Sequence, residues 1–228
     1  YLQAFCGTIL SPYYGGDTEW FIAELSKRYS GVAAFSMRSI ESGRWKVVFD
    51  GTDLDYTEGV AWQSDVLADI GLARQLVPEA FAAAGSMNAF VEALVNYAGN
   101  AGEQALAKQV RDAIGFVGAE VVRIQSQHAG LSRSDALSQI DLIGHSLGGA
   151  VVALVREAYE GRLGGGTAFS APLPSDLLYG EGLRKVARYG DPISLLGEDP
   201  QEVFYFESSG ELPLTDHEIV PLSFIIQE

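Results

Sequence analysis

The chain has 228 residues, enough for one domain with a large core, and we expect residues 1–228 to form a single domain. Its formal net charge is −15, with 30 acidic against 15 basic residues, which argues against nucleic acid as a partner and disfavours unassisted docking on strongly anionic lipid. Cys6 is the only cysteine, which excludes an internal disulfide and a structural thiolate zinc site, and no apolar run reaches the roughly 18 residues of a transmembrane segment.

The first half of the chain predicts helices on either side of two short strands. Residues 18–29 predict a helix capped by a threonine, and residues 32–37 and 44–49 predict the strands. Residues 61–76 predict a second helix from apolar side chains three to four positions apart. The alanine-rich residues 81–101 predict a short helix, which we interpret as core, with a cover over an active site as the alternative.

The second half alternates helices with strands. An unbroken apolar stripe predicts a long helix over residues 103–127, followed by a loop over 129–137 and then a strand that runs directly into a helix. Further strands are predicted at residues 167–170, 183–189, 203–206 and 219–226. This alternation predicts an α/β fold with a mostly parallel central sheet and helices on both faces.

The motif Gly144-His145-Ser146-Leu147-Gly148 lies where the predicted strand meets the predicted helix. A Gly-x-Ser-x-Gly sequence in that setting is typical of the nucleophile elbow of α/β-hydrolases. The tight turn exposes the serine oxygen to a base, which a serine needs because it is a poor nucleophile on its own. The glycines let strand and helix pass close to the turn. We therefore predict that Ser146 is a nucleophile.

A serine nucleophile requires a base, and the chain offers three histidines. His145 lies inside the turn, so its side chain is expected to point away from Ser146. His128 follows the long predicted helix and suits a surface position. His217 comes after the elbow in a polar segment, and α/β-hydrolases place their histidine last in the chain. We therefore predict His217 as the base.

The carboxylate that orients the base is expected between Ser146 and His217, at the end of a strand. Asp191 follows the strand predicted over residues 183–189 and precedes a proline. Asp199, in a loop, is the second candidate, and Asp176 suits a helix cap. The Leu147 N–H is expected to donate to the oxyanion of the transition state. Thr52, after the strand predicted over residues 44–49, is expected to provide the other donor.

An ordered series of segments resembles the class 3, or fungal-type, lipase family, which has an α/β-hydrolase core. The resemblance covers most of the chain and lies in Phe49-Asp50-Gly51-Thr52, Trp62-Gln63-Ser64-Asp65-Val66, the elbow from Gly144 to Ala150, Thr167-Ala168-Phe169-Ser170-Ala171-Pro172 and Tyr189-Gly190-Asp191-Pro192-Ile193. Asp50 departs from the family pattern, since it stands where the family has arginine. The disulfides of the secreted fungal members cannot form here, which favours a bacterial relative.

The resemblance also implies a lid directly after the oxyanion residue, which assigns residues 53–61 to the lid. Leu54, Tyr56 and Trp62 are then expected to face acyl chains, with transient contact to a lipid interface.

The sequence therefore predicts a serine ester hydrolase that cleaves acyl or lipid esters through Ser146, His217 and Asp191 and needs no cofactor or metal. Three alternatives remain open: a phospholipase A1 or lysophospholipase, a non-catalytic binding module on the hydrolase scaffold, and the toxic or degradative domain of a larger secreted protein.

Overall fold

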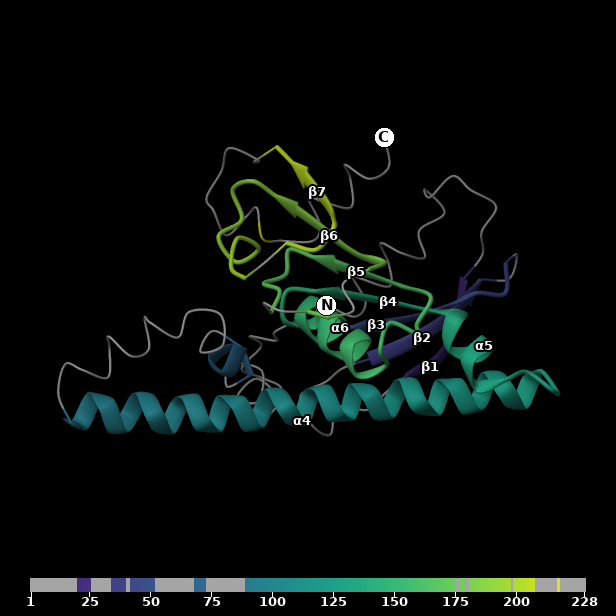
Figure 1. Cartoon of the computed structure of the whole chain (residues 1–228), viewed down its shortest axis with the longest axis horizontal. Coiled ribbons are helices and arrows are strands. Elements are labelled where there is room, and N and C mark those ends of the chain that lie inside the picture. The colour runs from purple at the N-terminus through teal and green to yellow at the C-terminus, as the bar shows by residue number, and fades with distance from the viewer. Residues whose placement is uncertain are drawn as a thin grey trace.

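In the computed structural model, the part of the chain that the structure describes forms one sheet of seven strands, and their spatial order is their order along the chain (Figure 1). The structure describes residues 20–25, 34–39, 42–51, 68–72, 89–174, 177–178, 181–197, 199–207 and 217. The strands are β1 (Trp20–Leu25), β2 (Ala34–Ser39), β3 (Trp45–Phe49), β4 (Ile140–His145), β5 (Gly165–Phe169), β6 (Leu183–Arg188) and β7 (Glu202–Phe206).

The sheet changes from antiparallel to parallel at β3. Strands β1, β2 and β3 pair antiparallel, whereas β3 through β7 all pair parallel. The prediction of a mostly parallel sheet in an α/β fold is thus confirmed. Parallel strands end at the same edge of a sheet, and here Phe49 pairs with Gly144 while His145 pairs with Phe169. The residues that follow β3, β4, β5 and β6 therefore meet along one edge.

The sheet is flanked by helices α4 (Ala89–Gln127), α5 (Arg133–Ser138) and α6 (Leu147–Ala158). Helix α4 runs along the molecule for 39 residues, and α6 lies between it and the strands (Figure 1). Residues 68–72 are also helical, and Ala68 and Leu72 pack with Leu106 of α4 and Leu147 of α6. A second helical layer on the opposite face of the sheet stays a prediction.

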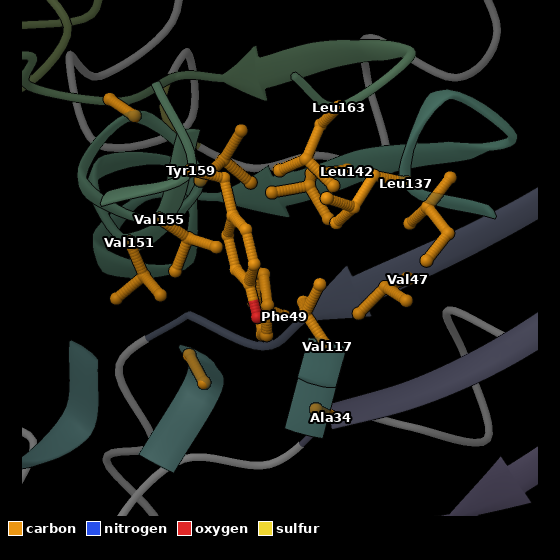
Figure 2. Packing of buried hydrophobic residues seen from close by; sticks show 14 of the residues in the cluster. Ala34, Val47, Phe49, Val117, Leu137, Leu142, Val151, Val155, Tyr159 and Leu163 are labelled. Carbon is orange, nitrogen blue, oxygen red and sulfur yellow. The ribbon is translucent and has the colours of Figure 1, made fainter. Parts of the chain in front are cut away.

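The main core lies between α4, α6 and the same face of β3 and β4 (Figure 2). Its strands contribute alternate residues such as Val47, Phe49 and Leu142, because successive side chains of a strand point to opposite faces. The Tyr159 ring reaches from the end of α6 toward Val117 of α4 (Figure 2), and its hydroxyl donates to the Ile114 carbonyl at 3.0 Å. This core holds α6, the helix that follows the elbow, against the sheet.

The predicted helix over residues 18–29 is wrong, because Trp20–Leu25 forms the edge strand β1. Its Trp-Phe-Ile start favours a strand, and pairing with β2 satisfies the backbone groups on the side that faces β2. The strands predicted at 32–37, 44–49, 167–170, 183–189 and 203–206 are confirmed, with ends shifted by a few residues. The strand predicted over residues 219–226 lies outside the described residues.

The helices predicted within residues 81–101 and 103–127 are one continuous helix, α4. Glycine usually weakens a helix, but Gly102 lies where α4 meets residues 68–72. A Cβ on Gly71 would come within 2.3 Å of the Gly102 carbonyl carbon. The glycines therefore allow a close contact and do not end the helix.

The predicted loop over residues 129–137 also contains a helix, α5. Its N-cap is Ser132, whose Oγ accepts the Asp135 N–H at 3.1 Å. This cap explains why a short polar stretch is helical immediately before β4.

Candidate active site

The elbow is a strained turn between β4 and α6. Ser146 has φ 53° and ψ −123°, a conformation that costs a non-glycine residue about 1–3 kcal/mol. Hydrogen bonds on both sides hold it: the Ser146 N–H donates to the Phe169 carbonyl at 2.9 Å, and the Gly149 N–H donates to the Ser146 carbonyl at 3.0 Å. The turn is therefore fixed to β5 on one side and to α6 on the other.

Two glycines let the strand and the helix approach this turn. A Cβ on Gly144 would lie 2.2 Å from the Gly148 carbonyl oxygen, and one on Gly148 would lie 2.3 Å from the Asp50 carbonyl oxygen. Real Cβ atoms do not come this close to backbone atoms. The Gly-x-Ser-x-Gly spacing is therefore a packing requirement, and it brings α6 against the end of β3.

Asp191 follows β6, and its carboxylate is fully buried. Oδ1 accepts the Ile193 N–H at 2.9 Å across the turn. Burial alone raises the pKa of Asp191, but the hydrogen bond and positive charge of His217, together with the N–H groups of Ile193 and Ser194, outweigh it. The pKa of Asp191 is therefore below its ordinary value, which keeps the group ionised at neutral pH.

His217 lies between the serine and the aspartate. Its Nδ1 is 3.0 Å from Asp191 Oδ1, and its Nε2 is 2.9 Å from Ser146 Oγ. With the ring proton on Nδ1, His217 donates to Asp191 and accepts the hydroxyl proton of Ser146. The structure thus brings together the three residues that the sequence analysis selected, although they are 71 and 26 positions apart in the chain.

His145 makes a contact that the sequence analysis missed. Its Nε2–H donates to the main-chain carbonyl of His217 at 2.7 Å, whereas Ser146 Oγ contacts the His217 ring. The two rings lie 5.1 Å apart. Burial lowers the pKa of His145 to about 4, despite the opposing effect of the hydrogen bond to His217. A neutral His145 therefore supports the backbone of His217, and only its place beside Ser146 hinted at this from sequence.

Of the two predicted oxyanion donors, Leu147 lies among the described residues and Thr52 does not. Leu147 is the first residue of α6, so its N–H has no acceptor within the helix. Thr52 lies outside the described residues, but its neighbour Gly51 lies against the elbow. A Cβ on Gly51 would be 2.8 Å from the His145 carbonyl oxygen and 3.4 Å from Ser146 Cβ. The chain therefore leaves β3 directly beside the serine.

Asp50 Oδ1 accepts the N–H of Gly51 at 2.9 Å, so the aspartate stabilises the turn after β3. The lid over residues 53–61, together with Leu54, Tyr56 and Trp62, lies outside the described residues.

Asp199, the second candidate for the acid, has different partners. Its Oδ1 is 2.7 Å from Lys185 Nζ and accepts the Tyr205 hydroxyl at 3.1 Å. Asp176 lies outside the described residues. Of the candidates that the structure describes, Asp191 is the one beside His217.

No protein-family model matches the chain, and no curated protein matches it in sequence. Within the described ranges, no group of three His, Cys, Asp or Glu side chains could hold a metal ion. None of the helices in that part of the chain has the length and apolar character needed to cross a bilayer. What the site can do therefore follows from its geometry and the chemistry of its residues.

Proposed function

We propose that this protein is a serine ester hydrolase with an α/β-hydrolase fold, related to the class 3 lipases, that cleaves acyl or lipid esters. The observation that supports it most directly is the hydrogen-bonded series from Ser146 Oγ through His217 to Asp191, at 2.9 Å and 3.0 Å. A serine on a strained turn, a histidine within reach of its proton and a buried carboxylate behind that histidine are the elements of nucleophilic acyl transfer.

In the proposed reaction, Ser146 Oγ attacks the carbonyl carbon of the ester while its proton passes to His217 Nε2. The oxyanion that forms accepts hydrogen bonds from the Leu147 N–H and from Thr52. The His217 imidazolium then protonates the leaving alcohol, which departs and leaves an acyl group on Ser146. Water attacks this acyl-enzyme with His217 again as base, releasing the acid. Throughout, Asp191 holds the productive tautomer and stabilises the imidazolium.

An apolar substrate suits the surroundings of the acid. Tyr189 and Leu195 lie on either side of Asp191 in the chain, and both side chains are exposed. Exposed apolar side chains in the segment that carries the acid are compatible with an apolar acyl chain, the substrate that the resemblance to class 3 lipases implies. Phospholipase A1 or lysophospholipase activity is the alternative within the same chemistry.

Two assays on purified protein test the proposal. The first is hydrolysis of p-nitrophenyl esters from acetate to palmitate by wild type, Ser146→Ala and Ser134→Ala, the last of which removes an exposed serine hydroxyl from α5. We expect turnover by wild type and Ser134→Ala and none by Ser146→Ala. The second is labelling by a fluorophosphonate, which reacts with activated serines, followed by mass spectrometry to locate the modified residue.

The outcomes separate the chemistry from the substrate. Labelling at Ser146 without ester turnover supports an activated serine and directs the search to phospholipids. A folded wild type that neither turns over any ester nor reacts with the phosphonate would refute the hydrolase and leave the binding module.

A further inference from the structure

A buried lysine lies on the strand that leads to the catalytic aspartate. Lys185, in β6, exposes 1% of its side chain. Burying an ammonium group is costly unless it is paired and hydrogen-bonded. Its Nζ donates to the Ser194 carbonyl and lies 2.7 Å from Asp199 Oδ1. The lysine therefore joins its own strand to two places in the segment after Asp191.

The first of these contacts reaches the turn that holds the aspartate. The Ser194 hydroxyl donates to the Asp191 carbonyl at 3.1 Å, and the Ile193 N–H donates to Asp191 Oδ1 at 2.9 Å. Ser194 is itself fully buried. A continuous series of contacts thus runs from Lys185 through Ser194 to Asp191, and from there to His217.

The second contact fixes the lysine from the other side. Asp199, whose side chain is 47% exposed, also accepts the Tyr205 hydroxyl at 3.1 Å. Burial and the neighbouring Asp199 raise the pKa of Tyr205 to about 12, so this hydroxyl keeps its proton at neutral pH. The Tyr205 ring stacks on Tyr189 at 5.0 Å. Both ends of the segment 189–199 are therefore tied to β6 and β7.

We propose that Lys185 is a positioning residue for the catalytic carboxylate: its ammonium group holds the turn 191–194 so that Asp191 Oδ1 faces His217 Nδ1. The inference rests on the proposed function, because it assigns Asp191 a catalytic role. Lys185 itself touches neither His217 nor Ser146 in any contact of the described residues. Its effect is transmitted through Ser194, and a displacement of about 1 Å in a catalytic group can cost about 100-fold in rate.

Lys185→Met tests this role, since methionine keeps much of the side-chain volume and removes the ammonium group. Arg184→Met is the matched control: it removes a cation from the adjacent position of the same strand, where the side chain is exposed and pairs with Glu202 at 2.6 Å. We expect kcat for a p-nitrophenyl ester to fall about 10- to 100-fold in Lys185→Met. We expect KM of Lys185→Met to change less than about twofold, because the substitution does not alter ester binding. We expect Arg184→Met to keep the kcat and KM of wild type.

A second measurement reads the Asp191–His217 contact without any substrate. The Nδ1 proton of a histidine bonded to a carboxylate gives a downfield NMR signal, which Asp191→Asn would assign by abolishing it. We expect this signal in wild type and Arg184→Met, and its loss or upfield shift in Lys185→Met. If wild type neither hydrolyses an ester nor reacts with the phosphonate but the signal changes in this way, Lys185 positions the Asp191 carboxylate and the proposed function fails.

Lys185→Met with a wild-type kcat and an unchanged signal would overturn the inference. If that variant does not fold, Ser194→Ala replaces it, because it deletes only the hydroxyl that binds the Asp191 carbonyl. The same fall in kcat and change in the NMR signal are then expected, and a wild-type result would overturn the inference equally.

Discussion

The neutral, enclosed His145 predicts a specific loss of stability in acid. Its pKa is about 4 in the folded protein against an ordinary value of 6.5. The unfolded chain therefore binds more protons than the native state between these two pH values. The stabilisation is present above pH 6.5 and is lost as the pH falls toward 4. From the two pKa values the loss attributable to His145 is about 2 kcal/mol at pH 5 and about 3 kcal/mol at pH 4.

His145→Gln isolates this effect, because a glutamine amide can donate to the His217 carbonyl but does not titrate. The assay is urea unfolding of wild type and variant at steps from pH 7 to pH 4. We expect the free energy of unfolding to fall more steeply with acid in wild type, by the amounts above. His128→Gln is the matched control, since it makes the same substitution at an exposed histidine. Parallel stability curves for wild type and His145→Gln would refute the idea that burial keeps His145 neutral.

The remaining predictions concern the acid and the elbow. Asp191→Asn should lower kcat for an ester by about 10⁴-fold, because the wrong histidine tautomer is favoured. Asp199→Asn should lower kcat by less than about tenfold. If Asp199→Asn has the larger effect, Asp199 is the acid. Gly148→Ala should destabilise the fold by about 2 kcal/mol, since its Cβ would lie 2.3 Å from the Asp50 carbonyl oxygen. Gly115→Ala, on α4, should stabilise the fold by about 0.5–1 kcal/mol, because no atom lies within 4 Å of the new Cβ. Thermal unfolding measures both glycine variants, and a loss of stability in both would contradict this contrast.

Local signals made most of the site predictable from sequence. The elbow is encoded within five residues, and its packing reason involves Gly144 and Gly148 themselves. Asp191 and His217 are selected because α/β-hydrolases carry their triad in the chain order serine, acid, histidine. The chemical roles of these residues stay predictions, whereas their proximity is a property of the fold.

Contacts between distant residues could not be predicted in the same way. Trp20–Leu25 is a strand because β2 offers it a partner, a fact absent from its own apolar spacing. Helix α4 continues through Gly102 because residues about thirty positions earlier pack there. The bond from His145 to the His217 carbonyl spans 72 positions. Asp191 and Asp199 both follow strands or loops in the right part of the sequence, and they are separated by their partners: Asp191 contacts His217, whereas Asp199 contacts Lys185.

The sheet has a consequence for synthesis, because the strands that the structure describes lie side by side in the order in which they are made. Each new strand of β2 through β7 can add to the edge left by the one before it, and none has to be inserted between strands already paired. Ser146 and Asp191 can therefore take their places in the fold before His217 leaves the ribosome. Under the proposed mechanism, Ser146 has no base until the segment that carries His217 docks, so its activation would wait for that docking.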